Sequence, residues 1–261
     1  MSSKRRISPA ERRHQDYLRR KGLKVGHLYE ARLLRLRAHE VKRVLQICAD
    51  YPNPAGWPGI IEANLNETYL PKWYDGLYTN VGLPMCKSTV RDMNKAKAGA
   101  SDELDAYWLD SLHAYAADRA GSNIVIVSGT LRESLIGILR DQMEEQLGLG
   151  IEKLTKRIYD KYQEIAKWQV RRIAQTESMI SMADAADVAA KTLEVEFTKQ
   201  WCISGLGNTR DTHELMDGVE VDQNEPFVLQ GGRMLYPHDD SLGAAASEII
   251  NCACSCIRIP K

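Results

Sequence analysis

Side chains that could bind a metal gather in the last quarter of the chain. His213, Cys252 and Cys254 offer an imidazole and two thiols, which are ligand types that zinc prefers, and Cys202 or Cys256 could supply a fourth donor. Two cysteines at positions i and i+2 of a strand point to the same face, about 7 Å apart. The chain has no C-x-x-C pair. Metal binding is therefore one interpretation of these residues.

Acid–base chemistry is a second interpretation. His213, His238, Asp239 and Asp240 could bind a divalent ion or act as general acid and base, as a nuclease or another hydrolase would require. The last three follow Pro237, however, where aspartate commonly caps a turn. The chain also lacks the P-loop, G-x-G-x-x-G, G-x-S-x-G and H-E-x-x-H patterns. We expect no catalytic residue, no metal and no cofactor.

A structural role explains the same residues without any reaction. Arg210, His213, Asp239 and Asn251 would form a buried polar network that holds short hairpins together. The paired thiols of the C-x-C segment would pack beside this network as small apolar groups. We favour this interpretation, and metal binding by His213 and the two thiols is its alternative.

These residues must be positioned by a chain of 261 residues, which is long enough for one large or two modest domains. Its composition, 44% hydrophobic and 27% charged, is typical of a soluble globular protein. The pattern predicts an α+β protein: a mainly α-helical body over about residues 1–197, followed by a small α+β C-terminal module with short strands. We divide the chain into a basic, mobile arm (1–24), a helical body (25–197) and the module (198–261).

Within the body, apolar spacing predicts a helix over about 25–49 and a helix over about 101–120 that ends at Gly121. Three prolines predict a loop over 50–59, and residues 60–100 are expected to form short helices and turns. The β-branched run 124–127 predicts a strand. The remaining predictions are a capping box formed by Thr130 and Glu133 that opens a helix, and a further helix from Ile151 into a stretch rich in alanine and methionine.

Charge is unevenly distributed along the chain. Residues 1–43 hold fourteen Lys or Arg against four Asp or Glu, a net charge of +10 in a chain whose total is zero. Such a segment could contact nucleic acid or an acidic partner. No zinc finger or helix-turn-helix spacing indicates sequence-specific DNA reading. We expect no membrane segment. The six arginines that could contact DNA or an acidic partner are Arg5, Arg6, Arg12, Arg13, Arg19 and Arg20.

The order of residues after position 200 resembles a known family. The chain runs through a tryptophan, T-R-D-T-H, a glycine, P-F, M-L-Y-P-H-D and I-N-C-A-C. This order and spacing resemble the C-terminal domain of the MuF-type phage head morphogenesis proteins, also called minor capsid proteins. The residues that match the family pattern are Trp201, Arg210, His213, Gly218, Pro237, Asp239, Asn251, Cys252 and Cys254.

The resemblance extends over about residues 130–261. Residues 173–177 read I-A-Q-T-E where the family has I-A-R-T-E. Two departures lie in the module: the pair 206–207 is Leu-Gly where the family often has an aspartate, and Ala253 replaces an arginine. Some larger members carry a toxin or ADP-ribosyltransferase domain after the module. Because this chain ends at Lys261, we do not expect such a domain here.

The resemblance implies a structural or binding role rather than an enzyme. Such proteins join the procapsid through the portal vertex, travel inside the head, and assist assembly, DNA packaging or ejection. The implied partners are the portal protein, a scaffold or major capsid protein, and phage DNA bound nonspecifically. The implied locations are the virion head or portal vertex, and the host cytoplasm during assembly. The alternatives are a metal-dependent nucleic-acid-processing enzyme of a phage head or packaging module, and a nonspecific DNA-binding protein that uses the basic arm.

Overall fold

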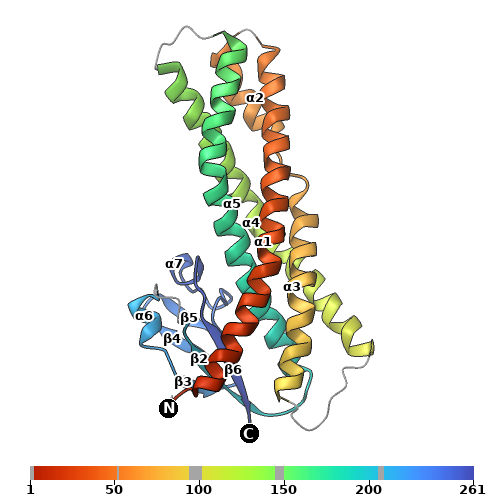
Figure 1. Ribbon diagram of the computed structural model, residues 1–261, viewed down its shortest axis with the longest axis vertical. Coiled ribbons are helices and arrows are strands. Elements are labelled where there is room, and N and C mark those ends of the chain that lie inside the picture. The colour runs from red at the N-terminus through yellow and green to blue at the C-terminus, as the bar shows by residue number, and fades with distance from the viewer. Residues whose placement is uncertain (1–2, 52, 94–101, 145–149, 205–208) are drawn as a thin grey trace. The chain divides into compact units, whose positions relative to one another are not determined.

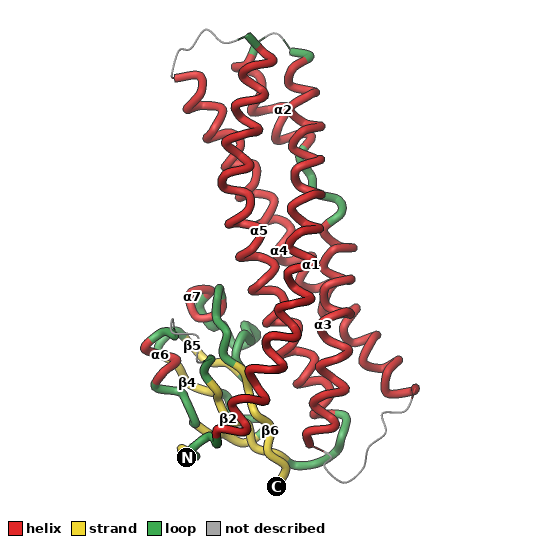
Figure 2. Tube along the Cα trace, in the orientation of Figure 1, coloured by secondary structure: helices red, strands yellow, loops and turns green. Residues whose placement is uncertain are grey.

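The computed structural model describes residues 3–51, 53–93, 102–144, 150–204 and 209–261. Long helices form most of the chain before residue 192, and short strands follow (Figures 1 and 2). The predicted α+β class, with a mainly helical body and a small C-terminal region of short antiparallel strands, is confirmed. The helices of the body are α1 (Pro9–Ala49), the short 3-10 helix η1 (Pro54–Gly56), α2 (Trp57–Asn64), α3 (Leu70–Met93), α4 (Asp102–Glu144) and α5 (Ile151–Lys191).

The chain divides into two compact units, and the division does not follow the predicted boundary near residue 197. Unit 1 comprises residues 1–28, 75–115 and 172–261, and unit 2 comprises residues 29–74 and 116–171. Helices α1, α3, α4 and α5 each contribute residues to both units. The last sixty residues therefore belong to one compact unit with segments of four long helices, and a module of that size needs such support because its own core is small.

Unit 1 contains the strands. The first sheet has the order β1-β3-β2-β6, in which every neighbouring pair is antiparallel, and β4 pairs with β5 in a second sheet. Figure 1 shows both chain ends beside the first sheet. The elements are β1 (Ser3–Lys4), β2 (Phe197–Cys202), α6 (Asp211–Glu214), β3 (Val219–Asp222), β4 (Phe227–Leu229), β5 (Gly232–Met234), α7 (Ala246–Ile249) and β6 (Ser255–Pro260).

The basic N-terminal segment, predicted to be a mobile arm, instead forms β1 and the first turns of α1. Helix α1 begins with a capping box. The Ser8 Oγ accepts the backbone N–H of Glu11 at 3.2 Å, and the Glu11 carboxylate accepts the backbone N–H of Ser8 at 2.8 Å. Pro9 at the first helical position costs nothing there, because its missing N–H would have no intrahelical partner.

Close helix contacts in unit 1 explain its small residues. A Cβ on Gly26 of α1 would lie 2.3 Å from the Ser178 Oγ of α5, so only glycine allows this approach. Most alanines of α5 are buried, as its composition predicts, and Trp108 and Leu112 of α4 share one apolar cluster with two of them. The buried members of that cluster are Cys86, Val90, Trp108, Leu112, Ala185, Val188 and Ala189.

Unit 2 is a helical core with a buried ion pair. Apolar side chains from α1, α2, α4 and α5 form a buried cluster, which includes Leu45, Trp57 and Leu135. Beside it, the Arg37 guanidinium donates to both carboxylate oxygens of Glu67, at 2.7 and 3.3 Å, and both side chains are almost fully buried. Paired charges of this kind must be satisfied within the protein, because water does not reach them.

Two local predictions for residues 124–133 are wrong. Residues 124–127 continue α4 instead of forming a strand, and the hydroxyl of Thr130 donates to the Ile126 carbonyl from inside that helix instead of capping a new one. The β preference of the run is weak and is overridden by burial of Leu131, Leu135 and Leu139, which are four residues apart on one helix face.

The predicted loop 50–59 and the predicted short pieces of 60–100 are also more helical than expected. Residues 54–56 and 57–64 form η1 and α2, each with a proline near its first position, where proline is tolerated. Helix α3 continues through Pro84 without ending. Gly121 likewise lies within α4 and does not end it. Residues 94–101 of the predicted stretch lie outside the described part of the chain.

Helix α4 bears on the expected lack of a membrane segment. Residues 103–144 contain a window with mean hydropathy 1.2, which is long and apolar enough to cross a membrane by length and composition, and 33% of that window is buried. Length and composition alone are weak evidence, because core helices pass the same test. The expectation of no membrane segment stays a prediction.

Candidate functional site

His213 is held in the interior of unit 1 by a carboxylate. The T-R-D-T-H segment leads into the single turn α6, which carries His213, and α7 carries Glu248. The His213 Nε2 lies 2.8 Å from the Glu248 Oε2, and the Thr212 hydroxyl donates to the same oxygen at 3.3 Å. His213 is 1% exposed, and the edge-on ring of Trp201 lies 5.3 Å from it, centroid to centroid. An Nε2–H that donates to Glu248 leaves the Nδ1 lone pair of His213 free.

The two thiols of the C-x-C segment face that free nitrogen. The Cys252 Sγ lies 3.5 Å and the Cys254 Sγ 3.4 Å from the His213 Nδ1. The backbone N–H of Cys254 points to the Cys252 Sγ at 3.4 Å. One imidazole nitrogen and the two sulfurs lie within 4.8 Å of one another, and all three side chains are buried.

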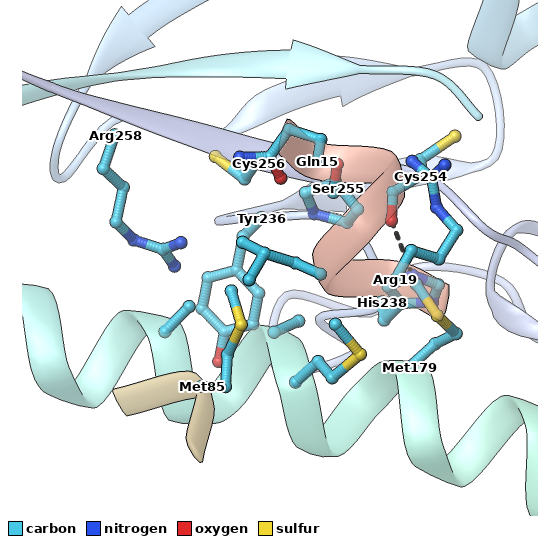
Figure 3. A pocket seen from close by; sticks show the side chains of 15 residues that line it. Gln15, Arg19, Met85, Met179, Tyr236, His238, Cys254, Ser255, Cys256 and Arg258 are labelled. Carbon is cyan, nitrogen blue, oxygen red and sulfur yellow. Dashed lines mark hydrogen bonds between the residues drawn. The ribbon is translucent and has the colours of Figure 1, made fainter. Parts of the chain in front are cut away.

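The backbone around the thiols is fixed from both sides. Asn251 has a positive φ of 58°, which bends the chain between α7 and the thiols, and its N–H donates to the Thr176 Oγ1 at 3.2 Å. Asparagine tolerates this conformation better than most residues. On the other side, the His238 Nε2 donates to the Cys254 carbonyl at 3.0 Å, the contact drawn as a dashed line in Figure 3.

The proton affinities in this cluster differ from their ordinary values. Burial lowers the pKa of His213, but its contacts with Cys252 and Glu248 raise that pKa above its usual value on balance. The two thiols titrate as a pair. A hydrogen bond from Cys254 and the positive charge of nearby imidazoles lower the pKa of Cys252, although burial opposes this. The contact with Cys252, together with burial, raises the pKa of Cys254. The pKa values of the two thiols thus shift in opposite directions.

A cavity opens onto the cluster. Its volume is about 480 Å³, within the range of sites for small ligands. Arg210 lines it and donates from Nη2 to the Ile250 carbonyl, which joins α6 to the end of α7. The lining residues are Gln175, Ser204, Thr209, Arg210, His213, Asn251, Cys252, Ala253 and Cys254.

The four residues that were expected to form one polar network make separate contacts in the structure. His213 pairs with Glu248, Arg210 with a backbone carbonyl, and Asn251 uses its backbone N–H while its side chain is exposed. Asp239 caps a different turn: its carboxylate accepts the N–H of Leu235 at 2.7 Å and that of Ser241 at 3.1 Å.

The other residues of the family pattern shape the strands around the site. Trp201 on β2 is fully buried, and its ring contacts Phe227 as well as His213. Gly218 has a φ of 78°, and a Cβ there would lie 2.6 Å from the Arg5 carbonyl oxygen. Pro237 is buried and lines the small pocket drawn in Figure 3. The departure at Leu206-Gly207 lies outside the described residues.

Sequence reasoning did not assign Glu248 or Lys199 to the site. Glu248 stands directly before the I-I-N-C-A-C segment, so its position in the pattern was a usable signal. Lys199 is fully buried on β2, and its Nζ donates to the carbonyls of Glu225 and Leu235 at 2.8 and 2.7 Å. Nothing in the local sequence marks this lysine, because it is buried only by strands that pack on it from elsewhere in the chain.

The six arginines of the basic segment fall into two groups. Arg5 donates to Glu11 at 2.7 Å and to Gln200 at 2.9 Å, Arg12 pairs with Asp217, and Arg19 pairs with Asp16. These three are engaged within unit 1. Arg6, Arg13 and Arg20 are exposed.

Comparison with known proteins gives one partial likeness. The chain is 32% identical over 111 residues to the NAD(+)–arginine ADP-ribosyltransferase EFV of Enterococcus faecalis. The match covers 38% of this chain and 22% of that protein. The chain thus spans about a fifth of the length of the curated relative it matches. No protein-family model matches the chain. No solved structure matches it either.

Proposed function

We propose that this chain is a phage minor head protein of the MuF type, which acts by binding at the portal vertex during procapsid assembly and not by catalysis. The observation that carries the proposal is the ordered set of residues from Trp201 to Cys254, which resembles the family's C-terminal domain. The partial likeness to the E. faecalis protein is compatible with it. The resemblance implies that some larger members join this module to a toxin or ADP-ribosyltransferase domain, and a match over only 22% of the E. faecalis protein would fit such a shared segment.

The packing of unit 1 supports a binding role. Three residues that match the family pattern have structural roles: Asp239 caps a turn, Gly218 admits the Arg5 carbonyl, and Trp201 fills the interior. All three positions are buried, so their roles lie in the packing of unit 1. A rigid surface built on such contacts suits recognition of a protein partner, because preorganised surfaces lose less entropy on binding.

The direct test is association with the portal protein of the same gene cluster. Co-expression of the two proteins, followed by size-exclusion chromatography and mass spectrometry, should yield a complex. A matched pair of variants sharpens the result. Gly218→Val should weaken the complex by disrupting unit 1, whereas Gly59→Ala in α2, where a Cβ meets nothing within 4 Å, should leave it intact. Absence of the wild-type protein from both the portal complex and purified procapsids would refute the proposal.

Arginine ADP-ribosylation is a second candidate, favoured by the activity for which the E. faecalis protein is named. Incubation of the purified chain with NAD⁺ and agmatine tests it, with release of nicotinamide as the readout. Turnover above that of a heat-inactivated sample would support this candidate. On the first proposal, no nicotinamide is released.

Nonspecific DNA binding through the basic segment is testable on the exposed arginines alone. Replacing Arg6, Arg13 and Arg20 with glutamine should abolish binding to a random duplex and flatten its salt dependence if this function is present. The matched control replaces Lys153, Lys156 and Arg157 of α5 with glutamine. These exposed residues lie in unit 2, and their replacement removes the same amount of positive charge. Equal effects of the two variants would attribute any binding to general charge.

A further inference from the structure

We propose that His213, Cys252 and Cys254 bind a zinc ion through one imidazole nitrogen and two sulfurs, with the fourth coordination position open to the neighbouring cavity. This site goes beyond the proposed binding function and does not depend on it. The sequence interpretation favoured a structural network over a metal, and the geometry reverses that preference.

The distances fit a tetrahedral ion. In such a site, with Zn–N near 2.0–2.1 Å and Zn–S near 2.3 Å, the edge between the nitrogen and a sulfur is about 3.6 Å. The two observed edges, from the His213 Nδ1 to the Cys252 and Cys254 sulfurs, are 3.5 and 3.4 Å. The three ligand atoms all lie within 4.8 Å of one another, so a single ion can reach them together.

The surroundings orient the ligands as a metal site requires. Glu248 accepts from the His213 Nε2, which fixes the tautomer whose Nδ1 lone pair faces the sulfurs. The Cys254 N–H lies 3.4 Å from the Cys252 sulfur and would stabilise negative charge on it. All three ligand side chains are buried, so the charge of two thiolates there needs a cation or hydrogen bonds to balance it.

The ligand types select the metal. Two thiolates and an imidazole suit zinc, whereas magnesium and calcium prefer oxygen ligands. Only three protein ligands converge among the described residues, and the cavity of about 480 Å³ is lined by all three. Water from the cavity would therefore complete the tetrahedron, as in zinc sites that keep one exchangeable position. Cys202 and Cys256, the donors considered from the sequence, are not part of the cluster.

The first experiment measures metal in the full-length protein, purified without a histidine tag and dialysed without chelator. Inductively coupled plasma mass spectrometry should find about one zinc per chain, and removal of the ion should lower the melting temperature because the ion binds only the folded site. Wild-type protein that retains no zinc after refolding with zinc and dialysis would overturn the proposal, whatever any variant does.

Variants identify the ligands. Cys252→Ser, Cys254→Ser and His213→Ala should each lose the bound zinc. The matched control is Cys256→Ser, which alters the next alternate position of the same segment and should retain about one zinc per chain. Glu248→Gln, a positioning change, should weaken zinc binding about 10–100-fold and not abolish it. Retention of full zinc by Cys252→Ser, or loss of zinc in Cys256→Ser, would overturn the assignment.

Cobalt substitution tests the open position. The Co²⁺ form should show thiolate-to-cobalt absorption in the near ultraviolet and the visible bands of a tetrahedral ion, and azide should shift those bands by replacing the water. Bands that stay unchanged at saturating azide would contradict the open fourth position. Cys254→Ser protein loaded with Co²⁺ is the control, because loss of one sulfur should reduce the thiolate absorption even if the metal is retained.

Discussion

Gly218 offers the sharpest test of how the N-terminal segment is held in unit 1. Two separate features disfavour a side chain at this position: the demand for a positive φ, here 78°, and the close approach of the Arg5 carbonyl. Gly243 makes only the first demand, because its φ is 77° and a Cβ there meets nothing within 4 Å. The variants Gly218→Ala and Gly243→Ala therefore differ only in the contact with Arg5.

The expected magnitudes follow from these two demands. A side chain in the left-handed region costs about 1–2 kcal/mol. Loss of glycine's freedom in the unfolded chain returns about 0.4–1 kcal/mol. Gly243→Ala should thus destabilise the protein by about 1 kcal/mol, the difference of those two terms.

Gly218→Ala adds the clash with the Arg5 carbonyl, which the protein can relieve by releasing the first residues. Release breaks the bond from the Arg5 N–H to the Gly218 carbonyl, at 3.0 Å, and the bond from Gln200 Nε2 to the Arg5 carbonyl, at 2.7 Å. Two net hydrogen bonds are worth about 1–3 kcal/mol together. We expect Gly218→Ala to be about 1–3 kcal/mol worse than Gly243→Ala.

The assay is urea unfolding followed by hydrogen-exchange mass spectrometry, which reads unit 1 separately from unit 2. Deletion of residues 1–5 completes a double-mutant cycle with Gly218→Ala. In the truncated protein the two glycine variants should cost the same, because the Arg5 carbonyl is gone. Equal costs in the full-length protein, or a difference that survives truncation, would refute the reasoning.

Three further predictions concern other contacts of the fold. Burial raises the pKa of Glu11, but hydrogen bonds from Arg5 and Ser8 outweigh it and lower that pKa to about 2. The free energy of unfolding of unit 1 should therefore fall as the pH drops from about 4.5 towards 2. Urea titrations at each pH should show a smaller loss in Glu11→Gln. Arg37→Met should cost unit 2 about 3–5 kcal/mol because it leaves the buried Glu67 carboxylate with the Tyr69 hydroxyl but without a counter-charge, and an Arg37→Met/Glu67→Leu double variant that is no more stable would contradict this account. Trp201→Ala should destabilise unit 1 by about 3–5 kcal/mol, with little change in exchange of unit 2 amides, and broad loss of protection in both units would argue against independent cores.

Local patterns predicted part of the fold well. The apolar spacing of Trp108 and Leu112 correctly predicted a buried face of α4, and the alanines of α5 correctly predicted a helix that neighbouring helices approach closely. Such periodicity reports which face is buried, because burial of that face stabilises the helix. The same reasoning failed at residues 124–127, where a weak β preference lost to burial of the leucines that follow on α4.

The capping-box prediction was wrong because the same four-residue pattern occurs at two places in the chain. The capping box was expected at Thr130 and Glu133, whereas Ser8 and Glu11 form the one at the start of α1. Both pairs have the same spacing, and only the surrounding packing decides which serine or threonine stands at a helix end. The basic charge of the first residues likewise suggested a mobile arm, although Arg5 and Arg12 pair with residues of unit 1.

The sequence by itself determined the inventory of the site: one histidine, a C-x-C pair and the tryptophan, in a fixed order. Their chemistry was readable from residue type, because imidazole and thiol groups are metal ligands wherever they converge. Tertiary structure decided that they do converge, since α6, α7 and the segment before β6 meet only when the strands pair. It also decided that Glu248 faces His213, because a contact across 35 positions depends on the path of the chain and leaves no periodic trace in the sequence.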